Sequence, residues 1–366
     1  MDSKSAWMVY NHYMKDHPAS RTSPGAHPAL IRLLLSLAAV CLTLLGMEAV
    51  FYVLGEAREQ SEGVSISTSR NLYQRDELLA ASPRPNIEVL VEKKRGEEVV
   101  YAVTYATDAY SRRITPMDNP DDRTRFVLFF GGSFTFGEGV EQNETLPFYV
   151  SELSPDYKAY NYGFLGYGPQ QMLAKLQSDD FASQIDESNG ILIYTFLDHH
   201  VNRAVGTARI YRFAFGGDYL NYVLQEDGTL VLDGTFTTGR PVASRLYRLF
   251  GKSRIVRYFK LDFPPITEKH IQTTAKIIEE ARDAFIQKFP DGKFYVLFFP
   301  NRSNQYGPRL APYLQTAGIE ILDYANAIPE YDEMWIPGDG HPTPQTYRLI
   351  AEMLVNDLEL ANTLAD

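Results

Sequence analysis

The feature that most restricts the fold is an alternation, from Arg125 onward, between short apolar segments and amphipathic ones. Helices are predicted at 169–177, at 268–289 and at 343–360, the last with Thr343 as its N-cap. The apolar segments have the length of buried strands: FVLFFGG (126–132), YKAYNYG (157–163), ILIYTFL (191–197), KFYVLFFP (293–300) and IEILDY (319–324). Strands that alternate with helices form a mostly parallel sheet covered on both faces. We therefore predict an α/β three-layer sandwich with a five-stranded sheet for residues 121–366.

One segment, 203–265, breaks the alternation because it is too long for an ordinary connection. It contains LNYVLQEDGTLVLDGTF (220–236), in which two apolar runs flank Glu-Asp-Gly, so we predict a hairpin. An insertion after the third strand lies near the carboxyl edge of the sheet, where ligands bind in open α/β folds. It is therefore either a lid or substrate-recognition element, or a surface hairpin without a role.

Residues 55–120 are predicted to form a linker and a small β-containing segment. Residues 55–80 are polar and suggest a tether or short helices. The runs IEVLV (87–91) and EVVYAVTY (98–105) flank the charged turn EKKRGE, which predicts a hairpin.

A long apolar run, Leu33 to Leu54, predicts one transmembrane helix, which we place at residues 30–54. About 22 helical residues span roughly 33 Å, enough to cross a bilayer. Its acidic residue, Glu48, lies toward the C-terminal end, within reach of the interface. The preceding segment is long and no small-x-small cleavage site follows, so we expect an uncleaved signal anchor; a cleaved signal peptide is the alternative.

Charges around this helix predict its orientation. Acidic residues dominate after the helix, whereas Lys4, Lys15, Arg21 and Arg32 precede it. The positive-inside tendency places residues 1–29 in the cytoplasm and the remainder outside it. The protein would then be single-pass in the inner (cytoplasmic) membrane, with a periplasmic domain. The net charge of -11 argues against nucleic acid as a partner, and the single Cys41 excludes an intrachain disulfide.

Ser133 is the candidate nucleophile. It follows Gly131-Gly132 at the end of the first predicted strand of the parallel sheet, where sites are normally built. The glycines allow a sharp turn, and a helix that begins after Ser133 would aim backbone N–H groups at an oxyanion. The pattern differs from the G-x-S-x-G turn of α/β-hydrolases because position 135 is threonine.

His341 is the candidate base. Of the seven histidines, His12, His17 and His27 precede the anchor and His270 begins a predicted amphipathic helix, which leaves His199, His200 and His341. His341 lies in a loop rich in glycine and proline, two residues after Asp339. A base must reach the nucleophile while a third group orients its ring, and this loop permits both. The alternative is that Asp339-Gly340 is a turn and His341 a surface residue.

Three segments resemble the SGNH/GDSL hydrolases, in particular a bacterial, membrane-anchored branch of esterases and O-acyltransferases. GGSFTFGEGV (131–140), with ETLP shortly after it, is similar to the first block of that family. NYGFLGYGPQQ (161–171) is similar to the second, whose glycine donates a backbone N–H to the oxyanion; that position is Gly163. GDGHPTPQTY (338–347) is similar to the last block. The resemblance implies an SGNH (flavodoxin-like) fold and a triad of Ser133, His341 and Asp339.

The sequence departs from the family pattern at two places. Gly132 stands where the family usually has an aspartate that organises hydrogen bonds near the nucleophile. The third block usually ends in an asparagine that donates to the oxyanion, and Asp198 takes that position here. A carboxylate would repel an oxyanion, so either His199, His200 or Asn202 is the donor or activity is reduced. The Asp198-His199-His200 cluster could also bind a cation, but no third His or Cys is near, and we expect neither metal nor cofactor.

Resemblance and predicted location together imply the function. We expect a serine esterase or O-acyltransferase, with acetyl as the expected acyl group, that acts on cell-envelope or exported glycan through an acyl-enzyme on Ser133. Its partners would be acylated polysaccharide or a small ester, the membrane, and proteins of envelope polysaccharide biosynthesis. The alternative is a catalytically impaired SGNH-fold module that binds glycan or scaffolds an envelope complex, which Gly132 and Asp198 favour.

Overall fold

The N-terminal helix α2, Pro28–Glu62, carries the apolar run. The computed structural model describes residues 28–301, 303–328 and 332–361, apart from the side chains of 56–62 and 332, and it divides into two compact units, Met1–Val53 and Leu54–Asp366. Within α2, the 28 residues Pro28–Gly55 have a mean hydropathy of 2.3 and are long and apolar enough to cross a membrane. The predicted span, 30–54, lies inside this stretch, which suits a signal anchor and a signal peptide equally.

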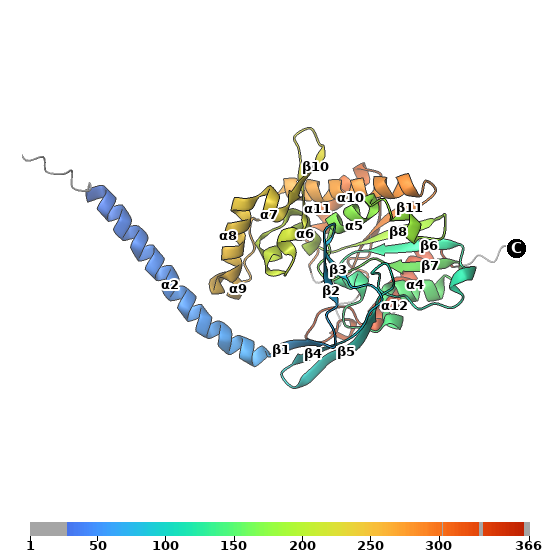
Figure 1. Cartoon of the computed structure of the whole chain (residues 1–366), viewed down its shortest axis with the longest axis horizontal. Helices are drawn as coiled ribbons and strands as arrows, with labels where there is room; N and C mark the ends of the chain where they lie inside the picture. Colours follow the sequence, from blue (N-terminus) through green and yellow to red (C-terminus); the bar gives the residue numbers. More distant parts are fainter. Residues whose placement is uncertain (1–27, 302, 329–331, 362–366) are drawn as a thin grey trace, which may run out of the picture. The chain divides into compact units, whose positions relative to one another are not determined.

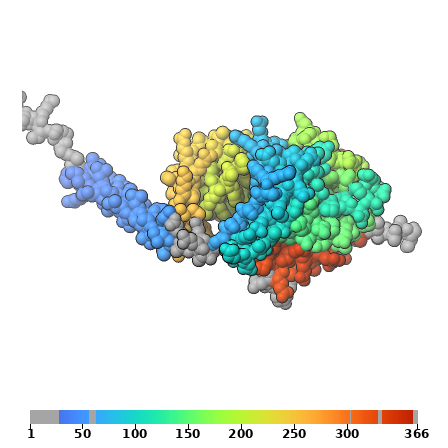
Figure 2. All heavy atoms as spheres, turned by 60° about the horizontal axis from the view of Figure 1, so that its bottom comes forward, coloured from blue at the N-terminus to red at the C-terminus, as the bar shows by residue number. Residues whose placement is uncertain are grey.

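The second unit begins with antiparallel strands. The predicted hairpin is confirmed as β4 (Glu88–Arg95) and β5 (Glu98–Ala106), with β1 (Val64–Thr68) on the outer side of β4. A separate two-stranded ribbon joins β2 (Tyr73–Asp76) to β3 (Ala80–Pro83). Residues 55–80 were expected as a tether or short helices; the structure ends α2 at Glu62 and forms β1 and β2 in the remainder, because the backbone there pairs with neighbouring strands. Figure 2 shows this blue-to-teal segment spread over one face of the unit.

The central sheet has five parallel strands in the order β12-β11-β8-β6-β7. Their bounds agree with the predicted apolar segments: β6 Arg125–Phe130, β7 Tyr157–Asn161, β8 Gly190–Phe196, β11 Lys293–Phe298 and β12 Glu320–Asp323. This is the flavodoxin-like order, in which the chain moves outward in opposite directions from the first strand. The predicted fold class is confirmed, and the reversal lies beside the carboxyl ends of β6 and β8.

Both faces of the sheet are buried, because successive side chains of a strand point to opposite faces. Val127 and Phe129 of β6 join the core with α4 (Leu146–Leu153) and α12 (Pro344–Asp357). Leu128 and Phe130 join the core on the other face, which is covered by α5 (Pro169–Gln177), α6 (His199–Val205), α10 (Glu268–Lys288) and α11 (Gly307–Thr316). Figure 1 shows α5 and α10 on one side of the sheet and α4 and α12 on the other.

The segment 203–265 lies between β8 and α10 and contains the predicted hairpin, β9 (Leu220–Leu224) with β10 (Leu230–Thr235). Three short helices follow the hairpin: α7 (Phe236–Gly239), α8 (Pro241–Lys252) and α9 (Arg254–Tyr258). A small core of its own joins Ile210, Tyr219 and Phe236 to Ala80 of β3. The insertion and the N-terminal strands therefore meet in one hydrophobic cluster.

Candidate active site

The three residues predicted as a triad meet at the carboxyl end of β6. Ser133 begins the short helix α3 (Ser133–Phe136), after Gly131 at φ 155°, a conformation that favours glycine. The Ser133 Oγ lies 2.8 Å from Nε2 of His341, and Nδ1 of His341 lies 2.5 Å from Oδ2 of Asp339. A hydroxyl, an imidazole and a carboxylate are thus in line within hydrogen-bonding distance, which is the arrangement of an activated nucleophile.

The loop that carries His341 is held on both sides. The carbonyl of His341 accepts from the Ile336 N–H at 2.8 Å, and the N–H of Asp339 donates back to the Ile336 carbonyl at 3.1 Å. The ring of His341 packs against Phe134, with centroids 5.2 Å apart. Directly after the loop, Thr343 caps α12 by accepting from the Thr346 N–H, as predicted. The base is therefore fixed by backbone hydrogen bonds and by packing.

Lys93 of β4 forms an ion pair with the Oδ1 of Asp339, whose side chain is fully buried. A second contact from the same strand joins Arg95 to the carbonyl of Gly338 at 2.8 Å. Burial raises the pKa of the Asp339 carboxyl, but the hydrogen bonds and charges of His341 and Lys93 outweigh it and lower the pKa to about 2. The acid therefore stays ionised throughout the neutral range. Sequence inspection missed Lys93, because a charged turn resembles an ordinary solvated surface.

Replacing Lys93 by methionine should lower both activity and stability. The buried carboxylate of Asp339 would lose a charged partner, which costs about 1–3 kcal/mol in the free energy of unfolding. Misorientation of the carboxylate should reduce kcat by about 10- to 100-fold. Because the pKa of Asp339 is depressed, its contribution to stability exists above its unfolded-state pKa and disappears as the pH falls toward about 2. The stability difference between the two proteins should therefore shrink between about pH 4 and pH 2.

Lys94→Met is the matched control, because Lys94 pairs with Glu92 at a more exposed position and makes no contact with Asp339. Urea unfolding and ester hydrolysis of the three proteins provide the measurements. Equal losses in Lys93→Met and Lys94→Met would show that the ion pair with Asp339 has no effect of its own.

Glu138 is a second acid beside the base, and the sequence did not single it out. Its Oε2 lies 3.2 Å from the Nε2 of His341, so its charge can stabilise the imidazolium that forms when the base takes a proton. One ligand atom each of Glu138, Asp339 and His341 lies within 4.8 Å of the others, a spacing that could hold a cation. A cation there would compete with Lys93 for Asp339 and with Ser133 for the imidazole.

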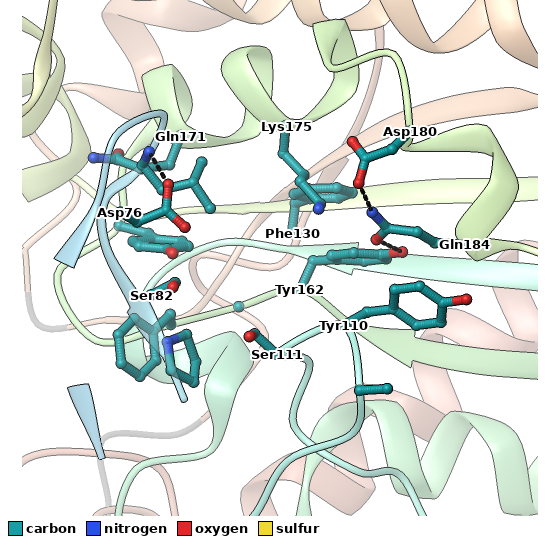
Figure 3. A pocket seen from close by; sticks show the side chains of 16 residues that line it. Asp76, Ser82, Tyr110, Ser111, Phe130, Tyr162, Gln171, Lys175, Asp180 and Gln184 are labelled. Atoms are coloured by element: carbon teal, nitrogen blue, oxygen red, sulfur yellow. Dashed lines mark hydrogen bonds between the residues drawn. The ribbon is translucent and has the colours of Figure 1, made fainter. Parts of the chain in front are cut away.

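The structure corrects the expected position of the second-block oxyanion donor. The N–H of Gly163 donates to the Oδ1 of Asn161 at 3.0 Å, so it is not free to bind an oxyanion. Gly163 also lines a separate cavity of about 230 Å³, which Figure 3 shows with Lys175 and Tyr162. Gly166 lines the cavity of Ser133 instead. In the described part of the chain, the N–H groups of Gly166 and Ser133 make no hydrogen bond.

Asp198 stands at the third-block position, and three neighbouring residues, His199, His200 and Asn202, were open candidates for the donor; the structure gives the four different surroundings. Asp198 accepts hydrogen bonds from Ser303, Gln305 and Tyr306, so its role is structural. His200 is fully buried beside Tyr194, with its Nδ1 2.9 Å from the Tyr194 hydroxyl.

The remaining two candidates line the cavity of Ser133. The amide of Asn202 donates to Asp262 at 3.1 Å. The Nε2 of His199 is buried and has no hydrogen-bond partner among the described residues. Burial and nearby positive charges, foremost that of Arg203, hold the pKa of His199 well below its usual value, so the ring is neutral.

The cavity of Ser133 has a volume of about 1000 Å³ and is bordered by three parts of the chain. The nucleophile and His341 loops form one wall, the β2–β3 ribbon contributes Tyr73, and the insertion contributes Phe213, Phe215 and Tyr219. The volume lies at the upper end of the range for small-molecule sites. The insertion thus borders the site, as a recognition element would.

No family model and no curated protein matches the chain. Solved structures that it resembles include a member of the lipolytic protein G-D-S-L family from Veillonella parvula, at 13% identity over 63% of this chain and 97% of that one, with a TM-score of 0.36. An acetyl xylan esterase from Butyrivibrio proteoclasticus shares 11% identity over 76% and 73% of the chains, with a TM-score of 0.39. A family two carbohydrate esterase from Clostridium thermocellum shares 10% sequence identity over 68% of each chain, with a TM-score of 0.37. The likeness concerns the fold alone, and the chemistry rests on the geometry above.

Proposed function

We propose that the protein is a serine esterase or O-acyltransferase that works through an acyl-enzyme on Ser133. The observation that carries the proposal is the continuous hydrogen-bond array from Ser133 through His341 to Asp339. A surface histidine with no role would have no reason to bridge a hydroxyl at a strand end and a fully buried carboxylate. The non-catalytic alternative, a glycan-binding module, does not account for this array.

The first half-reaction follows from the geometry. The Ser133 Oγ attacks the carbonyl carbon of the ester while its proton passes to Nε2 of His341. The tetrahedral oxyanion then collapses, the bond to the leaving alcohol breaks, and His341 returns the proton to the departing oxygen. Asp339 holds the ring and stabilises the imidazolium. Water or an acceptor hydroxyl, activated by His341 in the same way, releases the acyl group from Ser133.

Three donors can bind the oxyanion. The N–H groups of Ser133 and Gly166 carry no hydrogen bond in the described part of the chain and belong to residues that line the cavity. The neutral ring of His199 can supply a third N–H from Nε2, in place of the usual asparagine. The bonds that Asp198 accepts from residues 303–306 support this assignment, because they turn its carboxylate to other partners.

His199→Ala should therefore lower kcat by about 10²–10³-fold, the usual loss for one oxyanion donor, with a smaller change in KM. His199→Asn keeps an N–H donor on a shorter side chain and should recover part of the loss. Steady-state kinetics of the two variants with one ester provide the comparison. A near-normal kcat in His199→Ala would assign the third donor to another group.

The location and substrate of the reaction remain part of the proposal. An apolar helix at the N-terminus supports placement at a membrane, and a domain outside the cytoplasm would meet O-acylated glycans of the cell envelope. Such glycans carry acyl groups as esters of their hydroxyls. The cavity of Ser133, at about 1000 Å³, has room for a sugar unit as well as for the acyl group.

Hydrolysis of p-nitrophenyl acetate by the full-length protein in detergent tests the proposal. We expect turnover of p-nitrophenyl acetate and of the butyrate, because the cavity of about 1000 Å³ has room for either acyl group. Adding a neutral oligosaccharide separates the two activities, because mass spectrometry detects acetylated oligosaccharide only if the enzyme is a transferase. A folded protein without turnover of any of these esters would contradict the proposal.

A further inference from the structure

The cavity of Ser133 is rich in arginine, although the chain as a whole carries a net charge of -11. Acidic side chains in its wall are Glu138 and Asp339, which both contact His341, and Lys93 already neutralises Asp339. The arginines in the wall are Arg75, Arg84, Arg203 and Arg209. The wall therefore has an excess of positive charge beyond what the triad needs.

Most of these arginines have no acidic partner among the residues that the structure describes. Arg75 lies 3.6 Å from Asp218. For Arg84, Arg203 and Arg209, no carboxylate of the described residues lies within ion-pair distance. A positive charge without a counter-ion is costly in a partly desolvated site, and it attracts anions from solution.

Arg203 is the least exposed of the group, with 8% of its surface accessible. Its Nη1 donates to the carbonyl of Tyr167 at 2.7 Å. Burial lowers the pKa of its guanidinium to about 10, so the group stays charged at neutral pH. A Cβ at position 132 would lie 2.6 Å from this Nη1, closer than contact distance, so the guanidinium occupies the space that an aspartate side chain would need. Gly132 leaves the charge without that acid.

The positive surface continues beyond the cavity. Phe213 and Ala214 line both the cavity of Ser133 and an adjoining one of about 690 Å³. The second cavity adds Arg212, Arg248 and Lys252, all exposed and without a carboxylate of the described residues at ion-pair distance. Its acid, Asp218, faces Arg75. The two cavities thus form one track of cationic side chains, supplied mainly by the insertion 203–265.

We propose that the substrate is an acidic glycan whose anionic groups bind to this track while an ester on the same polymer reaches Ser133. Guanidinium groups bind carboxylate, sulfate and phosphate with two parallel hydrogen bonds, and aromatic side chains in the wall suit the flat faces of sugar rings. The inference rests on the proposed function for the ester, but its ionic part is independent of catalysis. The shared chemistry is a polymer with repeated oxyanions.

Binding is measured with the full-length Ser133→Ala protein in detergent, which cannot turn the polymer over. Polygalacturonate, dextran sulfate and neutral dextran are the probes. We expect at least one of the two charged polymers to bind at least about tenfold more tightly than neutral dextran, with an affinity that falls as salt rises. Binding of polygalacturonate alone assigns the site to carboxylates, dextran sulfate alone assigns it to sulfate- or phosphate-type groups, and binding of both assigns it to anionic charge in general. Equal affinity for the neutral polymer would overturn the proposal.

Arg209→Gln and Arg212→Gln, each added to Ser133→Ala, test the track. Both side chains are exposed, so the changes should not disturb the fold. Each should weaken binding of the charged polymer by about tenfold, the usual effect of one charge-assisted hydrogen bond. Arg348→Gln is the matched control, because Arg348 is also exposed, lies on α12, pairs with Glu352 and lines neither cavity. Unchanged affinity in both track variants would contradict the assignment.

Turnover separates this inference from the proposed function. O-acetylated polygalacturonate should be deacetylated with a higher kcat/KM than O-acetylated xylan, which is neutral. If p-nitrophenyl acetate is hydrolysed but the acidic polymer is neither bound nor preferred, the esterase proposal stands and the acidic-glycan proposal fails. If the acidic polymer binds but no ester is hydrolysed, binding stands and catalysis fails.

Discussion

Replacing Ser133 by alanine should lower kcat for p-nitrophenyl acetate by about 10⁴–10⁶-fold, because no other serine, threonine or cysteine among the described residues lines the cavity. The Ser133 hydroxyl has one hydrogen-bond partner among the described side chains, His341, so its removal leaves the surrounding packing intact. The loss should therefore appear in kcat, while the thermal midpoint of unfolding stays close to that of the parent protein.

His341→Ala should cause a loss of similar size, and the double variant should be no worse than either single one. The two residues act as a unit, so removing the second member of the array costs little once the first is gone. Ser183→Ala, at an exposed serine that contacts only a neighbouring carbonyl, serves as the control. Substantial turnover in Ser133→Ala would assign the chemistry to another residue.

Arg113→Leu should have the largest effect on stability, about 3–5 kcal/mol in the free energy of unfolding. Arg113 is 1% exposed, and burial lowers the pKa of its guanidinium to about 10. Its fork donates to the carbonyls of Phe136, Gly137 and Val140 at 2.8, 2.5 and 2.7 Å. Leucine would leave these carbonyls without that donor, and each buried acceptor that stays unpaired costs about 1–3 kcal/mol.

The same substitution should also reduce activity, because these carbonyls belong to the loop that follows Ser133 and carries Glu138. Urea denaturation of the parent, Arg113→Leu and Arg113→Lys gives the test, with the lysine variant intermediate because one ammonium cannot reproduce the planar fork. A change below about 1 kcal/mol for Arg113→Leu would mean that water or a local shift replaces the guanidinium.

The N-terminal strands contribute to the candidate site and do not serve only to connect the apolar helix α2 to the sheet. Tyr101 and Tyr105 of β5 and Val89 of β4 belong to the same hydrophobic core as β6 and α12. The position of Lys93 against Asp339 depends on that packing. Deleting residues 55–120 would therefore remove the ion-pair partner of Asp339.

Sequence patterns predicted the central sheet well because both of its faces are buried, so each strand is a nearly continuous apolar run. The sequence also indicated that Ser133, His341 and Asp339 come together, since Ser133 follows the glycines after the first such strand and His341 lies in a Gly- and Pro-rich loop two residues after Asp339. The role of Lys93 could not be predicted, because its partner Asp339 lies 246 positions away in the sequence and nothing near Lys93 indicates the contact.

The sequence could not distinguish between neighbouring candidates for the oxyanion donors. Gly163 and Gly166 stand in one motif, and only the side chain of Asn161 shows which N–H is already bound. His199 and His200 are adjacent at the start of α6, and consecutive helical side chains point about 100° apart. The first residue of α6 therefore decides which of the two rings faces the cavity of Ser133. No local pattern in the sequence indicates where α6 begins.

The most direct test of the central claim is covalent labelling of the full-length protein with a fluorophosphonate, followed by peptide mass spectrometry. We expect one modified peptide, with the label on Ser133, and no label in His341→Ala. Labelling at a different serine, or none in a folded protein at reagent concentrations that saturate a serine esterase, would contradict the assignment of Ser133 as the nucleophile.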